Sequence, residues 1–230
     1  MMKDLKNLTL IIPAKNEEES LPIVLDELKD YKLHKIVVIP EDDKKTYEAI
    51  SDYDCEIIFQ KKNGFGAALI EGLKNSKTLY SCIFNADGSF DPKDLPKMYN
   101  LLSDNNNNLD YVFTSRYSGN GGSDDDTLIT KIGNYFFTNL CNILYKTNAS
   151  DVLYTYVMGK TYSFISNDLK CNDFTICIEF IIKAHRNMQK YLFIESYERS
   201  RLKGIKKVNE IKDGFLILIY ILKQYFLFKK

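Results

Sequence analysis

Short apolar segments alternate with helix-like segments through the first half of this 230-residue chain. The apolar segments span residues 8–12, 35–39, 56–59, 80–84 and 111–115. The segments between them, 17–30, 44–51, 67–75 and 92–103, have helical patterns. The apolar segments are nearly continuous rather than alternating, which is typical of strands buried on both faces. The alternation therefore predicts an α/β fold with a Rossmann-like, mostly parallel sheet covered by helices on both faces.

Ligands bind outside the carboxyl ends of the strands in sheets of this kind. In this chain, that rule points to residues 13–17, 41–43, 61–66, 85–89 and those from 116 onward. Helical patterns return at residues 128–145 and 175–188, and a short strand is expected at 191–195. We expect one domain over residues 1–209, followed by an apolar helix over residues 210–230.

Residues 118–126, SGNGGSDDD, are rich in glycine and aspartate. Glycine and short polar residues in a row predict a mobile loop. The loop is either a lid over a site or a plain surface loop.

The C-terminal segment FLILIYILKQYFLF, residues 215–228, is interrupted by Lys223 and Gln224. It is therefore shorter than the ~18 uninterrupted apolar residues that a membrane-spanning helix needs. Three roles are open for this amphipathic helix: packing on the domain, forming an interface between two subunits, or lying on a membrane surface.

The chain carries 31 lysine and arginine residues and 31 aspartate and glutamate residues. Non-specific nucleic-acid binding needs a net basic surface, so nucleic acid is not an expected partner. None of the five cysteines stands in a C-x-x-C pair, and residues 1–8 lack the apolar core of a signal peptide. We therefore expect a cytoplasmic protein, either free or peripheral on the cytoplasmic face of a membrane.

The sequence Phe84-Asn85-Ala86-Asp87-Gly88 follows a buried apolar strand. A carboxylate at this position projects into the ligand crevice and suits Mg²⁺ or Mn²⁺ held together with substrate phosphates. An Asp-Gly pair after a strand is also an ordinary turn, so the motif alone leaves both interpretations open.

Two other strand ends carry weaker signals. The turn Pro13-Ala14-Lys15-Asn16-Glu17 opens a glutamate-rich segment and is either a plain helix cap or part of a nucleotide site. In Asn63-Gly64-Phe65-Gly66, glycines allow the backbone to approach a ligand closely, but a lone G-x-G is not a dinucleotide fingerprint.

A basic stretch, ERSRLKGIKKVN, spans residues 198–209. It is either a solvated surface loop or a segment that captures phosphate through arginine forks and lysine charges.

Taken in order along the chain, these segments resemble family 2 glycosyltransferases of the GT-A fold. The resemblance is strongest to the branch that contains dolichol-phosphate mannose synthase and polyprenyl-phosphate glycosyltransferases. The segments that carry it are LTLIIPAKNEEESL (8–21), KNGFGAALIEGL (62–73), CIFNADGSFDP (82–92), FTSRY (113–117), KIGN (131–134) and SRLKGIKKVN (200–209). Within the family pattern, Asn85 replaces the first aspartate of the D-x-D motif and Asp87 keeps the second.

The resemblance implies a role for each matching residue. Residues expected to bind the nucleotide sugar are Pro13, Ala14, Glu17, Asp42, Gly66, Asn85, Ala86, Asp87 and Arg116. Asp87 is expected to hold a Mg²⁺ or Mn²⁺ ion, and Asp87, Arg201 and Lys207 are the expected catalytic residues.

The implied reaction transfers a sugar from a nucleoside-diphosphate sugar to a lipid phosphate or a saccharide, with inversion at the anomeric carbon. An anionic lipid phosphate needs no general base, whereas a hydroxyl acceptor needs a nearby carboxylate. Asp124, Asp125, Asp126 and Asp151 are the candidates for that base. The alternative function is a nucleotide-sugar-binding protein with weak or no transfer activity.

Overall fold

The structure is a computed structural model that describes residues 3–203 and 209–228. Its described residues form a seven-stranded sheet in the order β3-β2-β1-β4-β7-β5-β8. Every pairing in this sheet is parallel except those of β7, which runs antiparallel to both neighbours. The strands are β1 (Lys3–Pro13), β2 (Tyr31–Ile39), β3 (Glu56–Phe59), β4 (Tyr80–Ile83), β5 (Tyr111–Ser115), β7 (Val157–Lys160) and β8 (Tyr191–Glu195).

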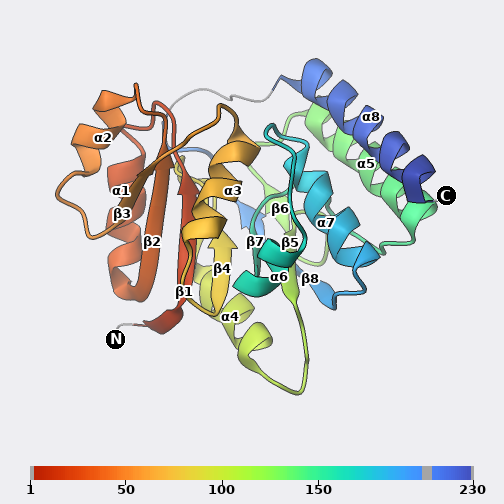
Figure 1. The fold of residues 1–230 in the computed structure, drawn as a ribbon, viewed down its shortest axis with the longest axis horizontal. Helices are drawn as coiled ribbons and strands as arrows, with labels where there is room; N and C mark the ends of the chain where they lie inside the picture. The colour runs from red at the N-terminus through yellow and green to blue at the C-terminus, as the bar shows by residue number, and fades with distance from the viewer. Residues whose placement is uncertain (1–2, 204–208, 229–230) are drawn as a thin grey trace.

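Helices cover both faces of the sheet, as expected (Figure 1). The helices are α1 (Leu21–Glu27), α2 (Lys44–Ile50), α3 (Phe65–Asn75), α4 (Leu95–Ser103), α5 (Leu128–Tyr145), α6 (Thr161–Ser166), α7 (Ile176–Arg186) and α8 (Glu210–Phe228). Two short 3₁₀ turns, η1 (Leu28–Asp30) and η2 (Pro92–Asp94), flank α1 and α4.

Alternate residues of β1 serve two separate cores, because successive side chains of a strand point to opposite faces. Leu10 and Ile12 join the core that α1, α2 and α4 cover. Ile11 joins the core that α3, α5, α6, α7 and α8 cover. The uninterrupted apolar strands of the sequence follow from this two-sided burial.

Several elements begin or end at other residues than predicted, and the strand β7 was not predicted. β2 begins at Tyr31 rather than at residue 35. α1 begins only at Leu21, because Glu17 first donates its backbone N–H to Thr46 Oγ1 and accepts a hydrogen bond from Ser20. The four-residue strand β7, which sequence analysis did not predict, is too short to produce a periodic pattern.

The C-terminal helix α8 packs beside α5 at one end of the molecule (Figure 1). The two helices run in the same direction, since Phe137 lies opposite Gly214 and the Tyr145 hydroxyl donates to the carbonyl of Ile221. Packing on the domain is thus one role of α8, whose Ile217 and Ile221 are buried. Within the described residues, no helix is long and apolar enough to cross a bilayer.

Candidate active site

A cleft of about 540 Å³ lies at the carboxyl ends of the central strands. It brings together residues that follow β1, β4 and β5 with residues of the segment after the short strand β9 (Tyr197–Glu198). The predicted site residues that line it are Pro13, Ala14, Glu17, Asn85, Ala86, Asp87, Arg116 and Arg201. Asp42 and Gly66 are outside its lining, and Lys207 lies outside the described residues.

Asp87 faces this cleft from the turn after β4. Its Oδ1 accepts the backbone N–H of Ser89 at 3.0 Å, and its Oδ2 lies 3.7 Å from Nη1 of Arg201. The side chain is 14% exposed, so it is neither sealed in the core nor loose on the surface. The neighbouring Asn85 donates its side-chain amide to Ser89 Oγ.

The turns after β1 and β2 are tied together by Asp43. This carboxylate caps α2 by accepting the N–H of Thr46, and it also accepts the N–H of Asn16 at 2.6 Å. Because Asp43 caps α2, it is buried, whereas its neighbour Asp42 is exposed to solvent. The predicted contact of Asp42 with the donor therefore stays a prediction.

The glycines of the Gly64-Phe65-Gly66 turn accommodate the chain's own backbone. A Cβ atom at Gly64 would lie 2.1 Å from the carbonyl oxygen of Asn172, and one at Gly66 would lie 2.2 Å from that of Cys171. The Asn172 carbonyl also accepts the N–H of Ala67. Gly66 is buried beneath this loop, so the predicted contact of Gly66 with the donor stays a prediction.

Glu179 of α7 holds that loop in place. Its carboxylate is 1% exposed and accepts the backbone N–H groups of Lys170 and Cys171, while Lys183 pairs with it at 2.7 Å. The loop continues into Asp173 and Phe174, which line the cleft next to Phe65. Glu179 thus supports one wall of the cleft from outside it.

Arg116 is the centre of a buried ion cluster beneath the cleft. Its guanidinium contacts Asp151 at 2.8 Å, Glu198 at 3.1 Å and Asp126 at 3.3 Å, and its side chain is 9% exposed. Burial alone would lower the pKa of Arg116, but the carboxylates around it, Asp151 above all, hold that pKa well above its usual range. Burial raises the pKa of Glu198, with Arg116 opposing that shift.

The acidic loop of residues 118–126 is anchored rather than mobile. Its strand β6 (Gly122–Ser123) pairs in parallel with β9, and Ser123 donates its hydroxyl to Glu198. The guanidinium of Arg201 donates two hydrogen bonds to the carboxylate of Asp125, of 2.6 and 3.2 Å. These contacts to a distant segment, which composition does not reveal, correct the prediction of a mobile loop.

Among the four base candidates, the structure brings Asp125 and Asp126 to the cleft. Asp124 is exposed and bonds to Tyr197, while Asp151 is buried against Arg116. Sequence reasoning missed Glu198, which also lines the cleft. Glu198 is the first residue of the basic stretch, but its pairing with Arg116, 82 residues earlier in the chain, leaves no signal in the sequence.

The other end of the cleft is mainly apolar and lies between α5 and α8, where Thr130, Glu210 and Asp213 add polar groups to the lining. Ile129, Gly133 and Phe137 of α5 face Gly214 and Ile217 of α8 across it. Outside the cleft, the two helices expose a row of apolar side chains that we call the α5–α8 face. It comprises Leu128, Ile132, Tyr135, Phe136, Ile143, Ile211, Phe215, Ile219, Leu222, Phe226 and Leu227.

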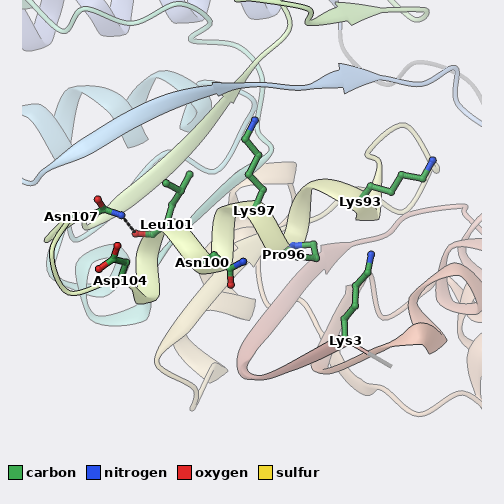
Figure 2. A pocket seen from close by; sticks show the side chains of 8 residues that line it. All are labelled: Lys3, Lys93, Pro96, Lys97, Asn100, Leu101, Asp104 and Asn107. Atoms are coloured by element: carbon green, nitrogen blue, oxygen red, sulfur yellow. Dashed lines mark hydrogen bonds between the residues drawn. The ribbon is translucent and has the colours of Figure 1, made fainter. Parts of the chain in front are cut away.

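A second hollow, about 670 Å³ in volume, lies along the outer side of α4 (Figure 2). Lys3, Lys93 and Lys97 surround it, together with Asp104 and its neighbours in the turn that follows α4. It sits toward the amino ends of the strands, away from the edge where sheets of this type bind ligands. We assign it no catalytic role.

Residues 9–166 match the family profile of glycosyl transferase family 2. A UDP-N-acetylglucosamine–dolichyl-phosphate N-acetylglucosaminyltransferase of Methanococcus voltae is 27% identical over 207 residues, covering 79% of this chain and 81% of that protein. An uncharacterized protein of Methanocaldococcus jannaschii is 25% identical over 225 residues, covering 94% of this chain and 90% of that protein.

Among solved structures, glucosyl-3-phosphoglycerate synthase of Mycobacterium tuberculosis superposes with a TM-score of 0.75 at 14% identity, covering 96% of this chain and 80% of that one. That crystal contains Mn²⁺, UDP and glucosyl-3-phosphoglycerate. The structural likeness confirms the predicted α/β fold, and the family profile spans well over half of the chain. The chain therefore belongs to glycosyltransferase family 2.

Proposed function

We propose that the chain transfers a sugar from a nucleoside-diphosphate sugar, with inversion, at the polar end of the cleft. The observation that carries the proposal is the meeting of Asp87, Glu17 and Arg201 on one cleft at the carboxyl ends of the sheet. In this assignment Pro13, Ala14 and Glu17 contact the nucleotide, and Asn85 and Ala86 contact the diphosphate sugar. Arg201 and Lys207 attract the phosphates of donor or acceptor.

The residues around Asp87 fit a Mg²⁺ or Mn²⁺ site completed by substrate. Among the described residues, no group of three or more His, Cys, Asp or Glu side chains is placed to hold a metal ion. Protein Mg²⁺ sites commonly consist of one or two carboxylates plus substrate phosphates, and Asp87 Oδ2 accepts no hydrogen bond among the described contacts. A bound cation would neutralise charge that develops on the leaving diphosphate.

We assign the other side chains of the cleft to phosphate binding, to positioning and to acceptor activation. Arg201 supplies a planar fork suited to phosphate oxygens. Arg116 is already engaged by three carboxylates, so we assign it the task of holding Asp126 and Glu198 at the cleft. A phosphate acceptor attacks without a base, whereas a hydroxyl acceptor would use Asp125, Asp126 or Glu198.

We propose a lipid phosphate as the acceptor. The relative of Methanococcus voltae is named as acting on dolichyl phosphate, and the apolar end of this cleft opens between α5 and α8. A saccharide acceptor is the alternative, since the polar end alone would suit it. We further propose that residues 1–209 form the catalytic domain and that the α5–α8 face rests on a membrane surface, which would make the protein peripheral.

Donor binding is tested by a thermal-shift panel of UDP-, GDP- and dTDP-sugars with Mn²⁺, because a ligand of the folded state raises the melting temperature. Transfer with the best donor should require Mn²⁺ or Mg²⁺. It should fall by about 100-fold or more in Asp87→Ala, which removes the charge that positions the cation. The melting temperature of the variant should stay near wild type. Donor binding without metal-dependent transfer would instead support a nucleotide-sugar-binding protein.

Membrane contact is tested by sedimentation with phosphatidylcholine–phosphatidylglycerol vesicles. Phe226→Glu and Ile211→Glu place charge on the α5–α8 face and should each weaken binding. Leu79→Glu is the matched control, because Leu79 is also an exposed apolar residue but lies before β4. A stable dimer in solution that either α8 variant dissociates would assign the face to a subunit interface instead.

A further inference from the structure

At the polar end of the cleft, Arg201 lies next to two carboxylates, those of Asp87 and Asp125. The guanidinium of Arg201 lies between Asp87, whose Oδ2 is 3.7 Å from Nη1, and Asp125, which it holds through two hydrogen bonds. The two acids come from different places, the turn after β4 and the loop after β6. Arg201 is bound to Asp125 and only near Asp87.

The two oxygens of Asp87 are in different situations. Oδ1 accepts the backbone N–H of Ser89, which fixes the orientation of the carboxylate. Oδ2 faces the guanidinium at a distance beyond a hydrogen bond. A cation that binds Oδ2 therefore meets the positive charge of Arg201 at close range, in a partly buried place where salt screens poorly.

Asp125 keeps the guanidinium at this position. The N–H of Asp125 donates to Ser123 Oγ, and Ser123 belongs to β6, which pairs with β9. The backbone after β9 is fixed as well, since Leu202 donates its N–H to the carbonyl of Asp87. Arg201 is thus held at both its backbone and its side chain.

We propose that Arg201, positioned by Asp125, opposes cation binding at Asp87 until a diphosphate is present. The phosphates give the guanidinium a new partner and offset its charge, so cation and nucleoside diphosphate bind cooperatively. Asp125 is then a positioning residue that acts through Arg201. This inference rests on the proposed function and adds the coupling between the two ligands and the residues that set it.

The experiment measures Mn²⁺ binding by electron paramagnetic resonance, with and without UDP or GDP, whichever stabilises the wild-type protein. Arg201→Gln should bind Mn²⁺ about tenfold more tightly than wild type when nucleotide is absent, a change typical of coupled sites. Its gain in Mn²⁺ affinity on adding nucleotide should shrink. Arg201→Lys keeps the charge and should stay near wild type without nucleotide.

Asp125→Asn should have the opposite effect and weaken Mn²⁺ binding without nucleotide. Asp125 holds the guanidinium 3.7 Å from Asp87 Oδ2, and without this partner the guanidinium is free to pair directly with Asp87. A distant charge effect would give the same sign, so the double variant is decisive. If Asp125 acts through Arg201, Asp125→Asn should change little in the Arg201→Gln background. Arg199→Gln is the matched control, because Arg199 pairs with Glu27 and is outside the cleft lining.

Two results would overturn the inference while leaving the proposed function standing. One is an Arg201→Gln protein whose Mn²⁺ affinity without nucleotide equals or falls below that of wild type. The other is an equal effect of Asp125→Asn in both backgrounds. A wild-type protein that binds no Mn²⁺ even with nucleotide would overturn the proposed cation site itself, and this inference with it.

Discussion

The two ends of the cleft are constructed in opposite ways. At the polar end, Asp87, Arg201 and Arg116 are held by ion pairs and backbone hydrogen bonds to specific partners. At the apolar end, between α5 and α8, glycines and apolar side chains form much of the wall, and Glu210 and Asp213 of α8 also line the cleft. Charge and fixed geometry thus define one end, while open space and apolar surface define the other.

This difference indicates how the two substrates are separated. A diphosphate needs charges at defined positions, so the groups that meet it must be fixed beforehand. An apolar chain needs only a surface that excludes water, which is non-directional. Substitutions at the polar end should therefore affect chemistry strongly, and folding as well where they break the buried ion cluster of Arg116, whereas those at the apolar end should mainly affect acceptor use.

The largest effect on stability is expected at Arg116. Arg116→Met leaves Asp126, Asp151 and Glu198 close together without their shared cation. Breaking a buried ion pair on one side costs about 3–5 kcal/mol, so we expect a loss of that size in the free energy of unfolding. Urea denaturation followed by circular dichroism measures it.

Arg199→Gln provides the comparison for Arg116. Arg199 also forms a two-pronged pair, with Glu27, but its side chain is about one-third exposed. Because solvent screens such pairs, the expected loss is only about 1 kcal/mol. An equal loss in the free energy of unfolding for Arg116→Met and Arg199→Gln would show that burial does not increase the contribution of the Arg116 cluster to stability.

The polar end was also the part that the sequence predicted best. Strands buried on both faces produce uninterrupted apolar runs, so the positions of Glu17 and Asp87 after β1 and β4 followed from the strand-end rule. The family resemblance then supplied their roles. Both signals are local, and local signals can be read from a single sequence.

The features that were missed depend on contacts between distant segments. Gly64 and Gly66 lack side chains that would otherwise collide with the backbone of residues 171–173. The acidic loop is anchored through Asp125 to Arg201, 76 residues away in the chain. Such pairings leave no periodic pattern, and the same is true of the short antiparallel strand β7.

At the apolar end, Gly133 should separate stability from acceptor use. A Cβ added at Gly133 would meet nothing within 4 Å, so packing does not require glycine in this helix. Gly133→Ala should raise the free energy of unfolding by about 0.5–1 kcal/mol, because alanine favours the helix. Gly133→Leu should fill the apolar end and raise the KM for a polyprenyl phosphate, with the nucleotide-sugar KM unchanged.

Lys131→Leu is the control for Gly133→Leu. It adds a similar side chain to α5 at an exposed position that does not line the cleft. Its KM for the acceptor should equal that of wild type. If both leucine variants change acceptor use equally, the effect comes from the surface of α5 and not from the cleft.

The smallest effect is a dependence of stability on pH, which we expect at the polar end and not at the apolar end. Burial raises the pKa of Glu198 above its ordinary value of 4.5, against the opposing pull of Arg116. The folded state therefore binds this proton more tightly than the unfolded state does. The stabilisation is fully present below pH 4.5 and is lost as pH rises through the folded-state pKa.

Glu198→Gln removes this titration, so its stability relative to wild type should increase as pH rises above 4.5, the ordinary pKa of the carboxyl group. Urea denaturation of both proteins across that range measures the difference. Gly133→Ala, at the apolar end, should shift stability by the same amount at every pH. A relative stability of Glu198→Gln that falls as pH rises would mean that attraction to Arg116 outweighs burial. The polar end would then be stabilised by its charges rather than strained by them.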